Sequence, residues 1–157
     1  MEKQPMTKSG KLKLDEELKR LVQVERPAVI KAIEVARGHG DLSENADYDA
    51  AKERQAFIES RISEIQGKLA IAEVINPQDI KSEKIVFGAT VGLLDLESDR
   101  KITYKIVGVD EANIKDGMIS IFSPLGRAMI GKKTGDIVEF SSPKGDKEYE
   151  VTSFEFK

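Results

Sequence analysis

The sequence predicts an α+β protein, with an N-terminal antiparallel two-helix coiled coil followed by a C-terminal antiparallel sheet domain with one short helix. Three observations support this prediction. Apolar residues recur every three or four positions in the first half, Gly38 and Gly40 interrupt that pattern, and beyond residue 84 the apolar period changes to two. We therefore expect two domains, residues 1–79 and 80–157.

The first helical stretch covers residues 11–37 and contains one interruption. Pro27 has no amide proton, and its ring restricts the backbone of the residue before it. The chain at Glu25-Arg26 should therefore leave the helical region or kink. We expect one helix near 11–24 and a second near 27–37.

The second helical stretch, residues 43–74, is longer and more regular. Its seam steps by three or four residues throughout and consists of Tyr48, Ala51, Gln55, Ile58, Ile62, Ile65, Leu69 and Ala72. Only Gln55 is polar, and the charged side chains lie off the seam. So narrow an apolar stripe is typical of a two-helix coiled coil with solvent around it. Asn76-Pro77 should end the helix.

Residues 38–49 form the predicted tip between the two stretches. The two glycines should end the first helix, because glycine takes up positive φ without penalty. Asp41 or Ser43 can cap the second helix, and Asp41 and Glu44 have the spacing of a capping box. The nine residues from position 41 contain no Lys or Arg and four acids, which are Asp41, Glu44, Asp47 and Asp49.

This acidic tip has two interpretations. Carboxylates are favoured at any helix N-terminus, so the acids can be ordinary surface residues. Alternatively, the hairpin presents an acidic point for insertion into a partner. Asp41 and Glu44 alone would hold Mg²⁺ weakly, because this ion requires near-octahedral coordination and usually takes one or two carboxylates plus other ligands. The second interpretation therefore requires a partner with a deep pocket that completes the site.

The second half reads as a small sheet after a linker at 77–84. Six segments are rich in β-branched residues with period two, and turn signals separate most of them: 85–87, 90–94, 102–107, 118–122, 137–140 and 149–154. Ser123 can cap a short helix with Pro124 at its first position.

Composition excludes several classes of function. The chain has 157 residues, a net charge of −3 and no Cys, so neither a thiolate metal site nor charge-driven nucleic-acid binding is indicated. There is no glycine-rich phosphate loop, nucleophile elbow or Cys-His cluster. His39, the only histidine, is expected to be a solvated loop residue rather than a catalyst. With no apolar run long enough to span a membrane, we expect a cytoplasmic protein without a membrane partner.

The tip sequence resembles a known family. Residues 40–48, with 24–27 before them and 50–53 after them, resemble the bacterial Gre transcript-cleavage factors, closest to the GreA branch. In the second half, residues 86–91, 104–108 and 121–128 are similar to the FKBP-like C-terminal domain of that family. The resemblance covers nearly the whole chain in order.

The resemblance implies a factor that binds bacterial RNA polymerase and inserts its coiled coil through the secondary channel. Asp41 and Glu44 would be the catalytic carboxylates and would hold a Mg²⁺ ion jointly with the polymerase. The polymerase itself would then hydrolyse the nascent RNA near its backtracked 3′ end, so the factor is not an enzyme on its own. The resemblance also implies that Leu42, Ser43 and Asn45 support the tip.

Further expectations concern contacts with the partner. Arg37 and Lys52 are candidates for contact with RNA, with ordinary surface charge as an equal alternative. Ser123, Pro124 and Arg127 are candidates for contact with the polymerase. We expect a monomer.

Two other functions are open. The chain can be a non-catalytic regulator that occupies the polymerase channel, or its FKBP-like domain can be a prolyl isomerase. The intact tip sequence favours the cleavage factor over the first, and the family's use of this domain in protein binding disfavours the second.

Overall fold

The computed structural model describes residues 2–41 and 44–157. By their internal contacts the residues form two units, Lys11–Ile71 and the combination of Met1–Gly10 with Ala72–Lys157. The sequence predicts a single division after residue 79. The structure groups both ends of the helical region with the sheet, because strand β1 (Gln4–Thr7) pairs in parallel with strand β2 (Ala72–Ile75).

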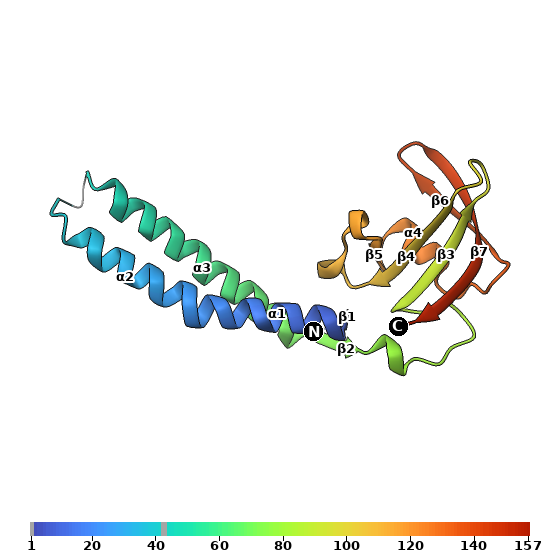
Figure 1. Cartoon of the computed structure of the whole chain (residues 1–157), viewed down its shortest axis with the longest axis horizontal. Coiled ribbons are helices and arrows are strands. Elements are labelled where there is room, and N and C mark those ends of the chain that lie inside the picture. Colours follow the sequence, from blue (N-terminus) through green and yellow to red (C-terminus); the bar gives the residue numbers. More distant parts are fainter. Residues whose placement is uncertain (1, 42–43) are drawn as a thin grey trace. The chain divides into compact units, whose positions relative to one another are not determined.

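The helical unit is an antiparallel hairpin (Figure 1). Its first arm consists of α1 (Lys8–Arg20), a π-helical turn (Leu21–Glu25) and α2 (Arg26–Arg37), and its second arm is α3 (Ala46–Ala70). Five apolar side chains are buried along the seam between the arms: Leu21, Val29, Ile58, Ile62 and Ile65. The predicted two-helix hairpin and most of its seam are therefore confirmed.

The first arm passes Pro27 without leaving the helical region, so that alternative in the prediction was wrong. The backbone at Glu25 is helical, with φ −69° and ψ −44°. The Arg26 N–H donates to the carbonyl of Leu21, five residues earlier. This wider π turn accommodates the proline, because it relaxes the close approach between the ring and the carbonyl one turn before it.

The second arm ends earlier than predicted. Helix α3 stops at Ala70, and residues 72–75 form β2 rather than the last turn of the helix. Their β-strand conformation depends on the partner strand β1, which lies more than sixty residues away in the sequence. The helical seam was predicted to include Ala72, and that assignment was wrong.

The other unit is built on a five-stranded sheet with the order β5-β4-β3-β7-β6. The strands are β3 (Ala89–Asp95), β4 (Lys101–Val107), β5 (Met118–Ser120), β6 (Ile137–Ser142) and β7 (Gly145–Phe156). Neighbouring strands are antiparallel except β4 and β5, which are parallel. The predicted α+β fold with a small sheet and one short helix is confirmed, and the sheet is mixed.

Residues 85–87, predicted as a strand, are not one. Ile85 is fully buried, but its backbone bonds the loop after helix α4 (Pro124–Met129) instead of a strand. The Ile85 N–H donates to the Lys132 carbonyl at 2.8 Å, and the Gly131 N–H donates to the Ile85 carbonyl at 2.7 Å. Apolar β-branched residues are thus selected here by burial rather than by a sheet ladder.

Candidate functional site at the hairpin tip

The first arm ends in a tightened turn. The His39 N–H donates to the Ala36 carbonyl at 3.1 Å, and the Gly40 N–H donates to the Arg37 carbonyl at 3.3 Å. Gly38 keeps helical angles, with φ −66°, whereas Gly40 has φ +102°. Of the two glycines expected to use positive φ, only Gly40 does so.

The second arm begins at Asn45, not at the predicted caps. The Asn45 Oδ1 accepts from the Tyr48 N–H at 3.0 Å, and helix α3 follows from Ala46. Asp41 therefore does not cap this helix. Ser43, the other predicted cap, and Leu42 lie outside the described residues. Asn45 is well suited to the position, because its amide supplies the cap and, as described below, a second bond to the other arm.

The two candidate catalytic carboxylates lie in the turn between the arms. Asp41 and Glu44 are both exposed. Asp47 and Asp49 follow in the first turn of α3, where the helix dipole favours negative charge. Within residues 2–41 and 44–157, no group of three or more His, Asp or Glu side chains could hold a metal ion.

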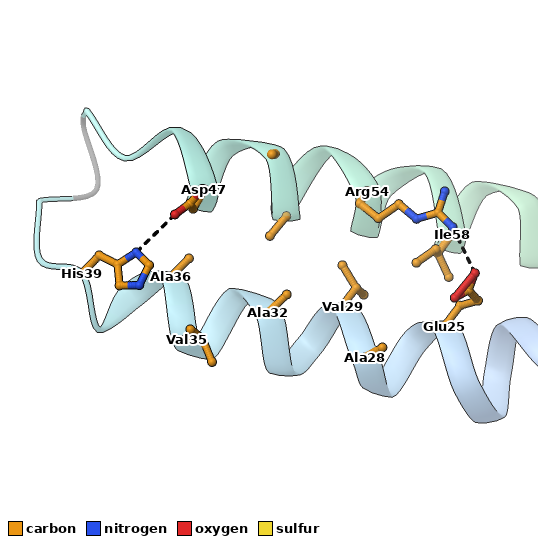
Figure 2. A pocket seen from close by; sticks show the side chains of 12 residues that line it. Glu25, Ala28, Val29, Ala32, Val35, Ala36, His39, Asp47, Arg54 and Ile58 are labelled. Carbon is orange, nitrogen blue, oxygen red and sulfur yellow. Dashed lines mark hydrogen bonds and ion pairs between the residues drawn. The ribbon is translucent and has the colours of Figure 1, made fainter.

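His39 lies beside these acids. Its Nδ1 is 3.4 Å from the Asp47 Oδ2, and the two side chains are 51% and 75% exposed (Figure 2). The pair links the end of the first arm to the first turn of the second. No pattern in the sequence predicted this contact.

The two candidate RNA-contacting residues are on different arms. Arg37 is the last residue of α2, and Lys52 lies on α3; both are exposed. The Lys52 Nζ donates to the Gln55 Oε1 at 3.2 Å, one turn further along the same helix.

A groove of about 590 Å³ lies between the arms next to the tip. Its two ends are marked by ion pairs, His39 with Asp47 and Glu25 with Arg54, the latter at 3.1 Å (Figure 2). Its lining is mostly small or aliphatic and includes Ala28, Ala32, Ala36, Ala50 and Ala51. Alanine at every fourth position from 28 to 36, in the half of the first arm next to the tip, was the signal in the sequence for this groove.

The predicted docking residues lie at helix α4 of the sheet unit. The Ser123 Oγ accepts from the Gly126 N–H at 3.0 Å and donates to the Ser120 carbonyl at 2.7 Å, and Pro124 is the first helical residue. Gly126 permits this geometry, because a Cβ there would collide with the Ser120 carbonyl oxygen. Arg127 is exposed in the last turn. The sequence-predicted cap and short helix are confirmed.

Ser123 and Pro124 also line a pocket of about 480 Å³. The aromatic side chains in its lining are Tyr104, Phe140 and Tyr149, and the last two rings lie 5.3 Å apart. Burial raises the pKa of the Tyr149 phenol, so this group stays neutral at physiological pH. Lys144 and Lys147 of the β6–β7 hairpin contribute positive charge to the lining.

Two family models match nearly all of the chain. The transcription elongation factor N-terminal model matches residues 4–74, and the GreA/GreB C-terminal model matches residues 80–156. The two matches together cover the helical hairpin and the sheet unit, and both models describe transcription elongation factors. The chain belongs to the GreA/GreB family.

Two relatives agree with this assignment in sequence. The chain is 56% identical over 156 residues to the transcription elongation factor GreA of Phenylobacterium zucineum, with 99% of each chain covered. It is 57% identical over 153 residues to GreA of Trichlorobacter lovleyi, covering 98% of this chain and 97% of the other. Among solved structures, GreA factor homolog 1 of Thermus thermophilus aligns over 97% of this chain and 98% of its own, with 27% identity and a TM-score of 0.44.

Across the described part of the chain, no helix combines the length and apolarity that a membrane crossing requires.

Proposed function

We propose that this factor binds RNA polymerase, inserts the hairpin tip through the secondary channel and stimulates hydrolysis of backtracked nascent RNA by the polymerase. The observation that carries the proposal is the exposure of Asp41 and Glu44 in the turn between the two arms of a narrow hairpin. Two carboxylates presented in this way can enter a confined active centre, and by themselves they form an incomplete metal site.

Asp41 and Glu44 would contribute oxygen ligands to a Mg²⁺ ion whose other ligands come from the polymerase and the RNA. As one of a pair of metal ions, it would help to stabilise the charge on the oxygens of phosphodiester hydrolysis. The tip acids have a second effect: they bring negative charge close to the acids of the polymerase, so a cation is favoured between them. Arg37 and Lys52, which are both exposed, would offset phosphate charge on the extruded RNA.

Docking is assigned to helix α4 and the pocket beside it. Ser123 and Pro124 contribute to an aromatic-lined pocket with lysines in its lining, and Arg127 is exposed on the same short helix. A pocket of this kind suits an apolar side chain of a protein partner flanked by acidic residues. The tip and the docking site belong to different units of the chain, so they can be altered separately.

The test is RNA cleavage in a purified, backtracked elongation complex, with Asp41→Asn and Glu44→Gln as variants. Each should lower the stimulated rate by roughly 100-fold, the size of effect seen when one preorganised charge-stabilising group is lost. Polymerase binding, measured by competition with the wild-type factor, should stay within a few-fold. Glu53→Gln, which removes an exposed acid from α3, is the matched control and should retain full activity.

Magnesium dependence tests the shared site directly. The wild-type factor should lower the Mg²⁺ concentration needed for half-maximal cleavage, and Asp41→Asn should raise it again. The free factor should bind Mg²⁺ only weakly, in the millimolar range or above. Binding to polymerase without any stimulation of cleavage would instead identify a non-catalytic occupant of the channel, and tight Mg²⁺ binding by the free chain would refute a shared site.

A further inference from the structure

We propose that Asn45 is the positioning residue of the tip, because its side-chain amide joins the last turn of α2 to the first turn of α3. The expected effect of Asn45 on RNA cleavage rests on the function proposed above. The hydrogen bonds of Asn45 are independent of that function, and they can be tested on the factor alone.

Both polar atoms of the Asn45 side-chain amide form hydrogen bonds. The Asn45 Oδ1 accepts from the Tyr48 N–H at 3.0 Å and so caps α3, while the Nδ2 donates to the Ala36 carbonyl of α2 at 2.6 Å. The residue is only 9% exposed and its bond to Ala36 is buried, so water competes poorly for the bond between the arms. Glu44 is the next residue along the chain, and Asp41 lies in the loop that these two bonds close.

Only an amide of this length meets both requirements. Serine, threonine and aspartate also cap helices, but serine and threonine are too short to reach across, and an ionised aspartate has no proton to donate to a carbonyl. A cap chosen for helix stability alone would therefore not need to be asparagine.

Two other contacts between the arms, both among the described residues near the tip, are weaker. The His39–Asp47 pair is exposed on both sides, and exposed ion pairs contribute little and are screened by salt. The side chains in the neighbouring groove are largely alanines, which offer little interlocking surface. Compared with these two contacts, the buried bond from Asn45 to the Ala36 carbonyl is the stronger constraint on where the two arms end.

Asn76 provides a matched comparison. Its Oδ1 also accepts a backbone N–H two residues on, from Gln78, and so caps the short helix at 77–79, but this bond is exposed and local. Asn45→Ser and Asn76→Ser thus remove the same atoms from two helix caps. Only the first change removes a bond between the arms.

The first measurement is the distance between spin labels on the two arms. The chain has no Cys, so Glu34→Cys and Asp49→Cys give one label on each arm near the tip. Asn45→Ser should broaden the distance distribution, and Asn76→Ser should leave it unchanged. Asn45→Asp, which retains the cap and the size but loses the donor, should broaden it too. An unbroadened distribution in both Asn45 variants would overturn the proposal.

The second measurement is cleavage by the unlabelled variants. A misplaced tip should lower the maximal stimulated rate of Asn45→Ser by between about 10- and 100-fold, with the half-saturating factor concentration unchanged. A loss that appears only in the half-saturating concentration would overturn the positioning role, as would a wild-type rate. If the wild-type factor itself does not stimulate cleavage, the proposed function fails, and the label distances still decide whether Asn45 holds the arms.

Discussion

The helical hairpin and the sheet unit bury their apolar side chains in different ways. The hairpin has a single seam, and apolar residues close to it, such as Val35 and Phe57, are 53% and 59% exposed. The sheet unit encloses a larger cluster of ten buried residues, to which helix α4 contributes Met129. In the hairpin, ion pairs between the arms flank the seam, and they include Arg26 with Glu59 and Arg61 with Glu17.

This difference explains where each unit can place a functional group. An enclosed core fixes the walls of a pocket, as at Tyr149 and Phe140. A single seam keeps a hairpin narrow, but it contributes little at the tip, where the lining is mainly alanine. Geometry at the tip must then come from polar bonds, which makes it sensitive to single substitutions.

The largest expected effect is on the free energy of unfolding, and it should differ between a buried leucine of the sheet unit and a buried isoleucine of the hairpin. Leu93 in β3 is fully buried and Ile58 in α3 is 1% exposed. Leu93→Ala should lower the free energy of unfolding by about 4 kcal/mol, and Ile58→Ala by nearer 2 kcal/mol, because the hairpin can close around the lost atoms more easily than the enclosed core can. Denaturant unfolding followed by circular dichroism and tyrosine fluorescence measures both.

Val35→Ala is the control for this comparison. The side chain is exposed, so its loss should change stability by less than about 0.5 kcal/mol. Equal losses for Leu93→Ala and Ile58→Ala would mean that the seam is packed as rigidly as the sheet core.

Local patterns in the sequence predicted much of both units. The period of Ile58, Ile62 and Ile65 predicted the second arm, and alternation predicted most of the sheet strands. These signals are local, because burial of one helix face or one sheet face selects residues at fixed spacing. The exposed acids Asp41 and Glu44 were also identified from local sequence.

Most of the missed features depend on contacts with other segments of the chain. Residues 72–75 are a strand because of residues 4–7, and Ile85 is bonded by the loop near Gly131. Asn45 was placed among the supporting residues of the tip, but its bond to Ala36 depends on how the arms meet. The π turn before Pro27 was also missed. The proline predicts an interruption of the α-helix, but it does not predict which backbone conformation replaces the regular turn.

The next effect concerns how β1 is held within the sheet unit. The Glu111 Oε1 accepts from the Thr7 N–H at 2.8 Å, and the other carboxylate oxygen accepts from the Thr7 hydroxyl. Thr7 is fully buried. Glu111→Ala should therefore cost about 1–3 kcal/mol, because it removes the carboxylate that accepts from the buried Thr7. Thermal unfolding and proteolysis at the N-terminus would detect the loss.

Two variants sharpen this result. Glu111→Gln retains one acceptor oxygen and should recover part of the stability. Glu148→Ala removes an exposed carboxylate from β7 of the same unit and should have almost no effect. If Glu111→Ala behaves like Glu148→Ala, pairing of β1 with β2 alone holds the N-terminal segment.

The smallest expected effect is the pH dependence of one ion pair between the arms. The Arg61 guanidinium donates to both oxygens of Glu17, at 2.7 and 2.8 Å, and both side chains are about one quarter exposed. The hydrogen bond from Arg61 lowers the pKa of the Glu17 carboxyl below its ordinary value of 4.5. The stabilisation is therefore complete at neutral pH and is lost as the pH falls through the lowered pKa.

Because the pair is partly exposed, acidification from about pH 6 to about pH 3 should remove no more than about 1 kcal/mol through Glu17. Glu17→Gln cannot titrate, so its stability should fall less steeply over that range than that of the wild type. Urea unfolding at a series of pH values, followed by the helical signal, gives both slopes. Glu34→Gln, an exposed acid of α2, should run parallel to the wild type. Identical slopes for Glu17→Gln and the wild type would show that the charged pair adds nothing to the seam, and that apolar burial alone holds this part of the hairpin together.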